Sequence, residues 1–436
     1  MKITFIRPNM AGSKASDSMP PLSIAVLDAL TPPGIETEFY DDRIERVPQG
    51  LKTDLAAITV ETFTARRAYA IAAELRRRGV HVVMGGYHPT FLPEEALEHA
   101  DTVIVGEAEG VWERMLEDFR AGKCRKIYEG GCLAPLAGAK YARKLFRGKK
   151  YVRVAPVQWS RGCGFACDFC SISAFYGATQ RRRPAEEVVA EIGSLGKKYF
   201  FLIDDNFARD REEAKKFLTA LAPLNIRWST QVSIDIAGDA ELLWLMQKSG
   251  CMAVLIGFES LDKRNLEQMG KGVNLRGAGY AAAVRRIKDH GIMVYGTFVF
   301  GYDFDTKDSF GATLDFALEN KLVLANFNPL MPMPGTPLYA RLEAEGRLIY
   351  KRWWLDPGFR YGDAMFRPRG MTAGELTEGC WKCRTEFNRY SSIAARALDL
   401  RANCASPGNL FIFLLSNLVS RKEIFRKQGA ALGGAE

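Results

Sequence analysis

The feature that most constrains this chain is a group of three cysteines within eight residues. Cys163, Cys167 and Cys170 follow a predicted apolar strand over Tyr151–Val157. Three thiolates this close can hold three irons of a cubic 4Fe–4S cluster and leave the fourth iron open for a small molecule. Zinc is the alternative, but it prefers four ligands in closely spaced pairs. Only one such pair is present and no His lies nearby, so the spacing favours iron.

The first 125 residues alternate short apolar segments with amphipathic ones. This alternation is typical of parallel strands that are covered by helices on both faces of a sheet. It predicts a doubly wound α/β domain of Rossmann or flavodoxin type over residues 1–125, which would bind a ligand beyond the carboxyl ends of its strands. The predicted strands are Lys2–Arg7, Glu36–Asp41, Leu55–Val60, Val80–Met84 and Thr102–Val105, and the predicted helices are Leu22–Leu30, Thr64–Arg78 and Gly110–Ala121.

A linker is expected over residues 126–150, where Gly and basic residues are frequent, and the strand–helix alternation then returns. Its six units predict a partial (β/α)6 barrel over residues 151–340. Polar side chains follow several of the strands, at the end where parallel barrels place their active sites. These residues are Asp204, Asp205, Asn206, Gln231, Ser233, Glu259 and Asp303. Asp and Asn are also good helix caps, so Asp205, Asn206 and Asp303 have that second interpretation.

Residues 341–436 are expected to form a mostly helical region over the barrel. A helix is predicted over Gly374–Ala397, and it carries Cys380 and Cys383. An apolar segment followed by basic residues runs from Asn409 to Lys427. Its apolar core is too short to span a bilayer, so it would lie at a membrane surface or pack over the barrel mouth.

Composition indicates the class of protein, its cellular location and the kind of partner it could bind. Hydrophobic residues make up 47% of it without an apolar run of 18 residues, which predicts a globular, cytoplasmic protein. Nine cysteines in 436 residues do not indicate a disulfide scaffold. The net charge of +9 permits an anionic partner, but the chain shows no nucleic-acid module. The clusters Arg76–Arg78 and Arg181–Arg183 are interpreted as solvated surface.

The cysteine spacing, with an aromatic residue just before the third Cys, resembles the radical S-adenosylmethionine (SAM) enzymes. In that family the open iron binds SAM, and an electron from the cluster splits SAM to give a 5′-deoxyadenosyl radical. The resemblance implies a 4Fe–4S cluster on Cys163, Cys167 and Cys170 and a reduced electron donor such as flavodoxin or ferredoxin. It implies SAM contacts for Phe169, Asp204, Asp205, Asn206, Gln231, Ser233 and Glu259.

The first domain looks like the cobalamin-binding domain that precedes the barrel in one radical SAM subfamily. The resemblance lies in its loops, from Met19–Leu22, through Gly85–Thr90, to Val105–Glu109. It implies cobalamin contacts for Met19, Pro20, Leu22, Thr62, Gly85, Gly86, Tyr87, His88, Gly106 and Glu107. The D-x-H-x-x-G signature that supplies a His to cobalt is absent, as is common in this subfamily. His88 is therefore either a cobalt ligand or a structural hydrogen-bonding residue.

These features predict a cobalamin-dependent radical SAM enzyme that methylates an unactivated carbon of a small molecule or a lipid. A non-methylating radical reaction, such as ring formation or ring contraction, is the first alternative. A non-catalytic binding protein stabilised by zinc is the second. The apolar and basic segment 409–427 adds peripheral membrane association to the predicted cytoplasmic location.

Overall fold

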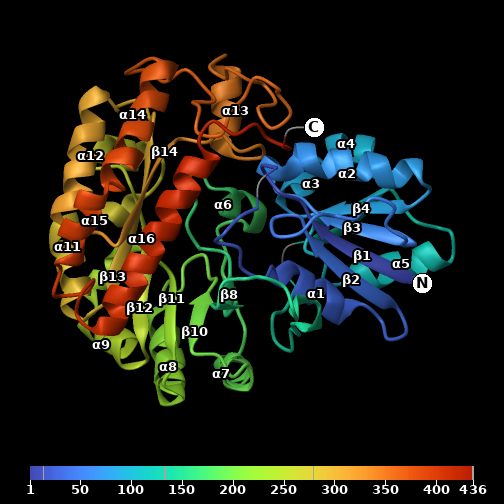
Figure 1. Ribbon diagram of the computed structural model, residues 1–436, viewed down its shortest axis with the longest axis horizontal. Coiled ribbons are helices and arrows are strands. Elements are labelled where there is room, and N and C mark those ends of the chain that lie inside the picture. Colours follow the sequence, from blue (N-terminus) through green and yellow to red (C-terminus); the bar gives the residue numbers. More distant parts are fainter. Residues whose placement is uncertain (13, 132–133, 278, 435–436) are drawn as a thin grey trace.

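A computed structural model describes residues 1–12, 14–131, 134–277 and 279–434. Two α/β domains lie side by side, and the C-terminal helices run along the outer side of the second domain (Figure 1). The chain end returns to the first domain: Trp353, Trp354, Phe359 and Leu432 are buried in the same hydrophobic cluster as Ile6 and Ile58. The two domains therefore share apolar core as well as a polar interface.

The first domain is a six-stranded parallel sheet in the order β2-β1-β3-β4-β5-β6, which confirms the doubly wound prediction. Neighbouring side chains of β1 point to opposite faces, so Phe5 packs with Trp112 while Ile6 packs with Ala68 and Leu75. The strands are β1 (Lys2–Arg7), β2 (Glu36–Asp41), β3 (Leu55–Thr59), β4 (His81–Gly85), β5 (Thr102–Gly106) and β6 (Ile127–Gly131), and the helices are α1 (Leu22–Leu30), α2 (Ala65–Arg77), α3 (Tyr87–Phe91), α4 (Pro93–His99) and α5 (Trp112–Arg120).

The sixth strand corrects the linker that was predicted over 126–150. Its Tyr128 is buried, and β6 pairs with β5 from Ile127 to Gly131. Only glycine fits at position 130, because a Cβ there would lie 1.7 Å from the Glu107 carbonyl oxygen. The glycines that suggested a loose connection instead let this strand approach its neighbour closely. Residues 132–133, in the same predicted linker, lie outside the described residues.

The second domain is an open, parallel six-stranded half-barrel in the order β14-β13-β12-β11-β10-β7. Its strands are β7 (Ala155–Val157), β10 (Tyr199–Leu202), β11 (Arg227–Val232), β12 (Cys251–Glu259), β13 (Met293–Phe300) and β14 (Leu324–Pro329). The covering helices are α7 (Ala185–Ser194), α8 (Arg211–Leu221), α9 (Ala240–Lys248), α10 (Lys263–Gln268), α11 (Tyr280–Asp289), α12 (Lys307–Glu319) and α13 (Pro337–Ala344). The first strand is shorter than the predicted Tyr151–Val157.

Three C-terminal helices, α14 (Ala373–Phe387), α15 (Tyr390–Ala397) and α16 (Pro407–Lys427), cover the free edge of this half-barrel. The edge strand β14 and the residues before it leave backbone carbonyls without a strand partner. Arg384 donates to the carbonyl of Phe327, Arg396 donates to those of Leu322 and Val323, and Asn417 donates to that of Val323. These side chains take the place of a further strand.

The single helix predicted over Gly374–Ala397 is wrong, because it breaks at Asn388 and Arg389. The Asn388 side chain bonds the carbonyl of Arg384 and ends α14. The carbonyl of Phe387 accepts from Ser392 and Arg396 in the next helix. Side-chain bonds thus replace the backbone bonds that would continue the helix.

Candidate functional site

The cysteine loop begins where β7 leads into the two-residue strand β8 (Ser160–Arg161), which pairs with β9 (Arg181–Arg182). Gly162 then turns the chain with a φ of 86°, and a Cβ there would lie 2.2 Å from the Thr179 carbonyl oxygen. Two carboxylates hold the entry: Asp204 accepts from the Ser160 amide, and Asp205 accepts from the Gly162 amide at 2.9 Å. The loop therefore starts from a fixed position.

The exit of the loop is held by the aspartate that lies between two of the cysteines. Asp168 accepts a hydrogen bond of 2.5 Å from the Tyr302 hydroxyl and pairs with Arg341 at 3.1 Å. Helix α6 (Ser171–Tyr176) then starts directly after Cys170. Contacts from β13's end and from α13 thus fix the last two cysteines, which the sequence spacing did not indicate.

All three cysteines have free thiols; Cys167 is buried, and Cys163 and Cys170 are half-buried. Burial raises the pKa of Cys163, and it raises the pKa of Cys167 to about 12, with the other two thiols as near neighbours. No trio of His, Cys, Asp or Glu within the described ranges is arranged around one point as ligands of a single metal ion. A cubic cluster has a different requirement, because each thiolate binds its own iron. Free neighbouring thiols at one loop fit that requirement.

A buried lysine lies beside the cysteines, and sequence reasoning missed it. Lys271 forms an ion pair of 2.5 Å with Glu259. Burial favours a lower pKa for Lys271, but Glu259 and Cys167 outweigh it and raise the pKa. A Cβ on Gly257 would lie 2.1 Å from a Glu259 carboxylate oxygen, so only glycine fits beneath the pair. The lysine stands in an irregular turn without a motif, so no sequence signal pointed to it.

The predicted SAM residues are only partly brought together. Asn206 donates to the Ser233 hydroxyl at 3.0 Å, and Gln231 donates to the Asp205 carbonyl at 3.1 Å, so the ends of β10 and β11 form one polar group. Phe169 is half-buried and meets Tyr302 edge-on at 6.5 Å. Glu259 ends β12 in a left-handed conformation with a φ of 62°.

Two of the strand-end carboxylates have structural partners. Asp204 is 1% exposed beneath the loop, and burial raises its pKa to about 7. It therefore supports Ser160 from below, away from solvent. Asp303 pairs with Arg347 at 3.0 Å and accepts from Gln268 at 2.7 Å.

A cavity of about 350 Å³ lies between the two domains. It opens at the carboxyl ends of β1 and β3, where the strand order reverses and doubly wound sheets bind ligands. Of the residues predicted to contact cobalamin, Leu22, Gly85, Gly86, Tyr87, Gly106 and Glu107 line it. Met19, Pro20, Thr62 and His88 do not line it. The barrel contributes Gln158, Arg161, Phe175, Tyr176 and Ile203 to its wall.

His88 is a structural residue. It is fully buried, and its Nε2 lies 2.9 Å from the Tyr69 hydroxyl and 3.1 Å from a Glu95 carboxylate oxygen. Trp354 packs edge-on against its ring. These contacts tie α3 to α2 and α4, and they turn the imidazole away from the cavity.

Arg161 lines the cavity on the barrel side, while Arg181 and Arg183 lie outside its wall. Arg161 pairs with Glu107 and Glu109 at 2.7 Å each, and Arg181 pairs with Glu107 at 2.7 Å. Arg183 pairs with Glu191 at 2.6 Å. The interpretation of Arg181–Arg183 as solvated surface is therefore wrong, because carboxylates meet these guanidiniums in the folded chain: Glu107 of the first domain meets Arg181, and Glu191 of α7 meets Arg183.

The cavity suits a large flat ligand such as a corrin. Three of its wall residues, Gly85, Gly86 and Gly106, let the backbone approach closely, while Leu22 and Ile104 add apolar surface. Tyr87 meets Phe175 with ring centroids 4.7 Å apart. Since Phe175 and Tyr176 end the helix that begins at Cys170, one short helix joins the cysteine loop to the cavity.

Comparisons with known proteins agree with this arrangement. The model of the Radical SAM superfamily matches residues 157–317, and that of the B12 binding domain matches residues 12–116. The chain is 32% identical to bacteriochlorophyllide d C-12(1)-methyltransferase of Chlorobaculum tepidum, over 97% of this chain and 94% of that enzyme. It is 29% identical to bacteriochlorophyllide d C-8(2)-methyltransferase of the same organism, over 76% and 78% of the two chains.

A solved structure shows the same fold at low identity. The radical S-adenosylmethionine methyltransferase TsrM from Kitasatospora setae, with cobalamin and a 4Fe–4S cluster bound, aligns with a TM-score of 0.63 and 18% identity. The alignment covers 79% of this chain and 75% of that one. The two domains and their order are thus shared with a protein whose structure contains both cofactors.

Proposed function

Because this chain belongs to the radical SAM enzymes that carry a B12-binding domain, we propose that it methylates an unactivated carbon of a small molecule. The position of helix α6 is the main support for this proposal, because the helix follows Cys170 directly and ends at the cobalamin cavity. Its six residues span about 9 Å at 1.5 Å per residue. A substrate held near this helix would face both cofactors. Family membership also argues against the second alternative, a non-catalytic binding protein stabilised by zinc.

The cofactors supply the radical and the methyl group, and the protein supplies position and exclusion of water. The cysteine loop holds the cluster, while Asn206, Gln231, Ser233 and Glu259 hold SAM at the strand ends. The aromatic contact between Tyr87 and Phe175 and the ion pairs of Arg161 keep the two domains closed around the cavity. A reduced flavodoxin or ferredoxin provides the electrons.

The product ratio tests the proposal. For each substrate methylated, two SAM and two electrons should give one 5′-deoxyadenosine, one methionine and one S-adenosylhomocysteine. Anaerobic turnover followed by chromatography and mass spectrometry measures these products. Equal amounts of 5′-deoxyadenosine and S-adenosylhomocysteine are expected. 5′-Deoxyadenosine without S-adenosylhomocysteine would contradict methylation and favour the ring-forming or rearranging alternative.

We infer a carboxylated tetrapyrrole as the substrate class. The first two relatives act on bacteriochlorophyllides, and one of them aligns over 97% of this chain. A bacteriochlorophyllide is therefore the first compound to test in the turnover assay.

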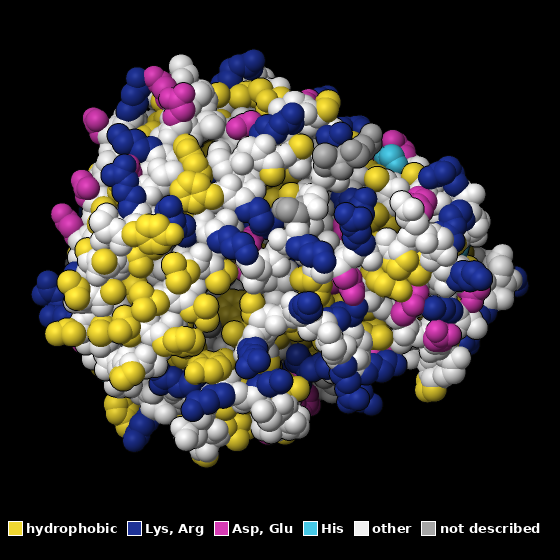
Figure 2. All heavy atoms as spheres, in the orientation of Figure 1, with side chains coloured by type: hydrophobic (Ala, Val, Ile, Leu, Met, Phe, Trp, Pro, Cys, Tyr) yellow, Lys and Arg dark blue, Asp and Glu magenta, His cyan; other side chains and the backbone are white. Residues whose placement is uncertain are grey.

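We further propose that the enzyme works in the cytoplasm at the surface of an anionic membrane. None of the helices in the described part is long and apolar enough to cross a bilayer. However, α16 exposes one apolar face, and Figure 2 shows hydrophobic side chains gathered there with Lys and Arg around them. The exposed apolar residues of the patch are Tyr390, Leu398, Leu400, Phe411, Leu414, Leu415, Leu418 and Phe425. An apolar face with a basic rim matches an anionic lipid surface.

Substituting Leu415→Asp together with Leu418→Asp is expected to lower vesicle binding by about ten-fold or more, because charges would replace two exposed leucines that the lipid surface would bury. Cosedimentation with phosphatidylglycerol vesicles measures this. Phe304→Asp, an exposed apolar residue outside the patch, is the control and should bind as the unmodified protein does. Equal sedimentation of the double variant would contradict the membrane proposal.

A further inference from the structure

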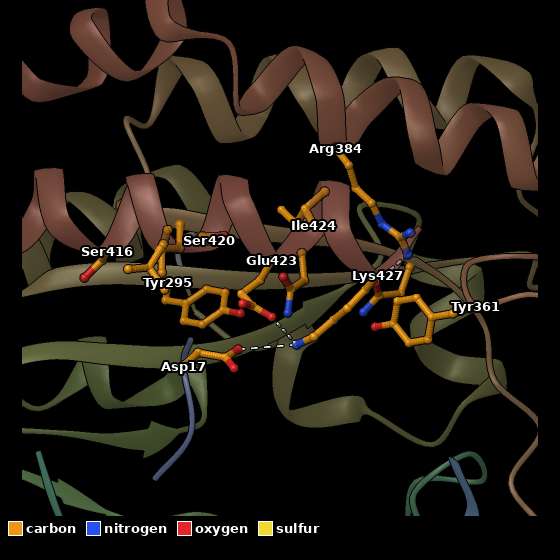
Figure 3. A pocket seen from close by; sticks show the side chains of 13 residues that line it. Asp17, Tyr295, Tyr361, Arg384, Ser416, Ser420, Glu423, Ile424 and Lys427 are labelled. Atoms are coloured by element: carbon orange, nitrogen blue, oxygen red, sulfur yellow. Dashed lines mark hydrogen bonds and ion pairs between the residues drawn. The ribbon is translucent and has the colours of Figure 1, made fainter. Parts of the chain in front are cut away.

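A second cavity, of about 360 Å³, lies between the inner face of the half-barrel and α16. Tyr295 of β13 and Asn326 and Asn328 of β14 point into it from the sheet. Ser416, Ser420 and Ile424 form the opposite wall on α16, and Leu324 and Val419 add apolar surface. Figure 3 shows Arg384 reaching down from its helix toward Tyr361. The cavity thus combines two tyrosines and three aliphatic side chains with hydroxyl, amide and charged groups, and Arg384 and Lys427 are its cations.

Arg384 has no anionic partner in the parts of the chain that the structure describes. The residue is 6% exposed, and its three hydrogen bonds go to the Phe327 carbonyl, Asn328 and Gln428, each at 2.8 Å. All three acceptors are neutral. A guanidinium has five N–H donors, so two are left for a ligand.

The other charged residues of this cavity compensate one another. Lys427 lies 3.3 Å from Asp17 and 3.5 Å from Glu423. Glu423 also accepts from Arg426 and from Ser16 of the first domain. Burial favours a higher pKa for Glu423, but these hydrogen bonds outweigh it and hold the pKa at about 2. The carboxylates are therefore engaged, and Arg384 is the charge without an opposite one.

A buried cation without an anion is costly, and a ligand carboxylate would relieve that cost through a paired, charge-assisted contact. We propose that Arg384 binds a carboxylate of the substrate, whose apolar body lies along Tyr295, Leu324 and Val419. This inference rests on the proposed function, since it assigns the substrate a position within the same half-barrel. Asn328, beside Arg384, lies near the carboxyl end of β14 and Leu324 lies at its amino end, so the carboxylate of the bound molecule lies nearer than its body to the strand ends that would hold SAM.

The test compares an acid with its ester on the intact, cofactor-loaded enzyme. Fluorescence titration measures the affinity for bacteriochlorophyllide and for its methyl ester. We expect the unmodified enzyme to prefer the acid, and Arg384→Gln to lose about 10- to 100-fold in affinity for the acid with no change for the ester. Arg384→Lys keeps the charge and should retain part of the preference. Arg389→Gln, an exposed arginine five residues away, should bind as the unmodified enzyme does.

Equal binding of acid and ester by the unmodified enzyme, or unchanged acid affinity in Arg384→Gln, would overturn the proposal. Absence of binding by either compound would overturn it as well. Iron content and circular dichroism show whether each variant has folded, and Arg384→Lys decides the matter if the Gln variant has not. Reductive SAM cleavage by the same preparation reports on the proposed function separately, so the two failures are distinguishable.

Discussion

Replacing Cys163, Cys167 or Cys170 by Ala will remove the iron cluster and reduce SAM cleavage to the background of the protein-free reaction. Each thiolate binds its own iron, so one missing sulfur leaves an iron without a protein ligand. The acidic side chains described around the loop are already engaged: Asp205 and Asp168 hold the loop itself, and Glu259 pairs with Lys271. Iron and sulfide content after anaerobic reconstitution, together with 5′-deoxyadenosine formation, measures the effect.

Other cysteines provide the matched control for this prediction. Cys380 is buried on α14 and Cys404 is half-buried after α15, and neither lies in the loop. Ala at either position should leave the iron content and SAM cleavage unchanged. Full iron content in any of the three loop variants would refute the assignment of the cluster.

Replacing Glu107 by Ala will open the domain interface and weaken cobalamin binding. Glu107 is 5% exposed and holds Arg161 and Arg181, so its loss leaves two largely buried guanidiniums short of a partner. Removing one member of a buried ion pair typically costs about 3–5 kcal/mol. Chemical denaturation followed by fluorescence measures the loss of stability, and cobalamin titration measures the loss of binding.

Glu191 is the matched control, because it also bonds two arginines, Arg143 and Arg183, but does not line the cavity. Glu191→Ala should lower stability while keeping the affinity for cobalamin. Wild-type stability and cobalamin affinity in Glu107→Ala would show that these ion pairs do not hold the interface.

The same contact predicts how the closed form depends on pH. Burial favours a higher pKa for Glu107, but the hydrogen bonds from Arg181 and Arg161 outweigh it and lower the pKa below its usual 4.5. A lowered carboxyl pKa contributes stability that is complete above pH 4.5 and is lost as the pH falls through the folded-state value. The Glu107-dependent part of the stability should therefore be constant from pH 5 to 8 and decline only in acid. Chemical unfolding of the unmodified protein and of Glu107→Ala, repeated from acidic pH to pH 8, measures this part of the stability.

Sequence reasoning predicted the features that depend on local patterns of residues, and it missed features that depend on contacts made in the folded chain. The cysteine spacing is a local pattern, and the buried strands have periodic apolar residues, so both were predicted. Sequence reasoning misassigned Gly130 and Gly131, because the same dipeptide suits a loose linker and a strand packed tightly against a backbone. It also extended one helix through Asn388, because apolar periodicity does not reveal the side-chain bonds from Ser392 and Arg396 that replace backbone bonds at Phe387.

The amino-acid sequence alone determined two α/β domains with parallel sheets, the cysteine loop near the start of the second domain and the polar residues at the strand ends. Each of these depends on residue type and spacing within one element. Folding added the partners of charged groups: Glu107 for Arg181, Glu259 for Lys271 and, among the described residues, only neutral acceptors for Arg384. These outcomes depend on which distant side chain arrives within a few ångströms, because a charge in a dry interior is costly unless an opposite charge or hydrogen-bonding groups lie beside it.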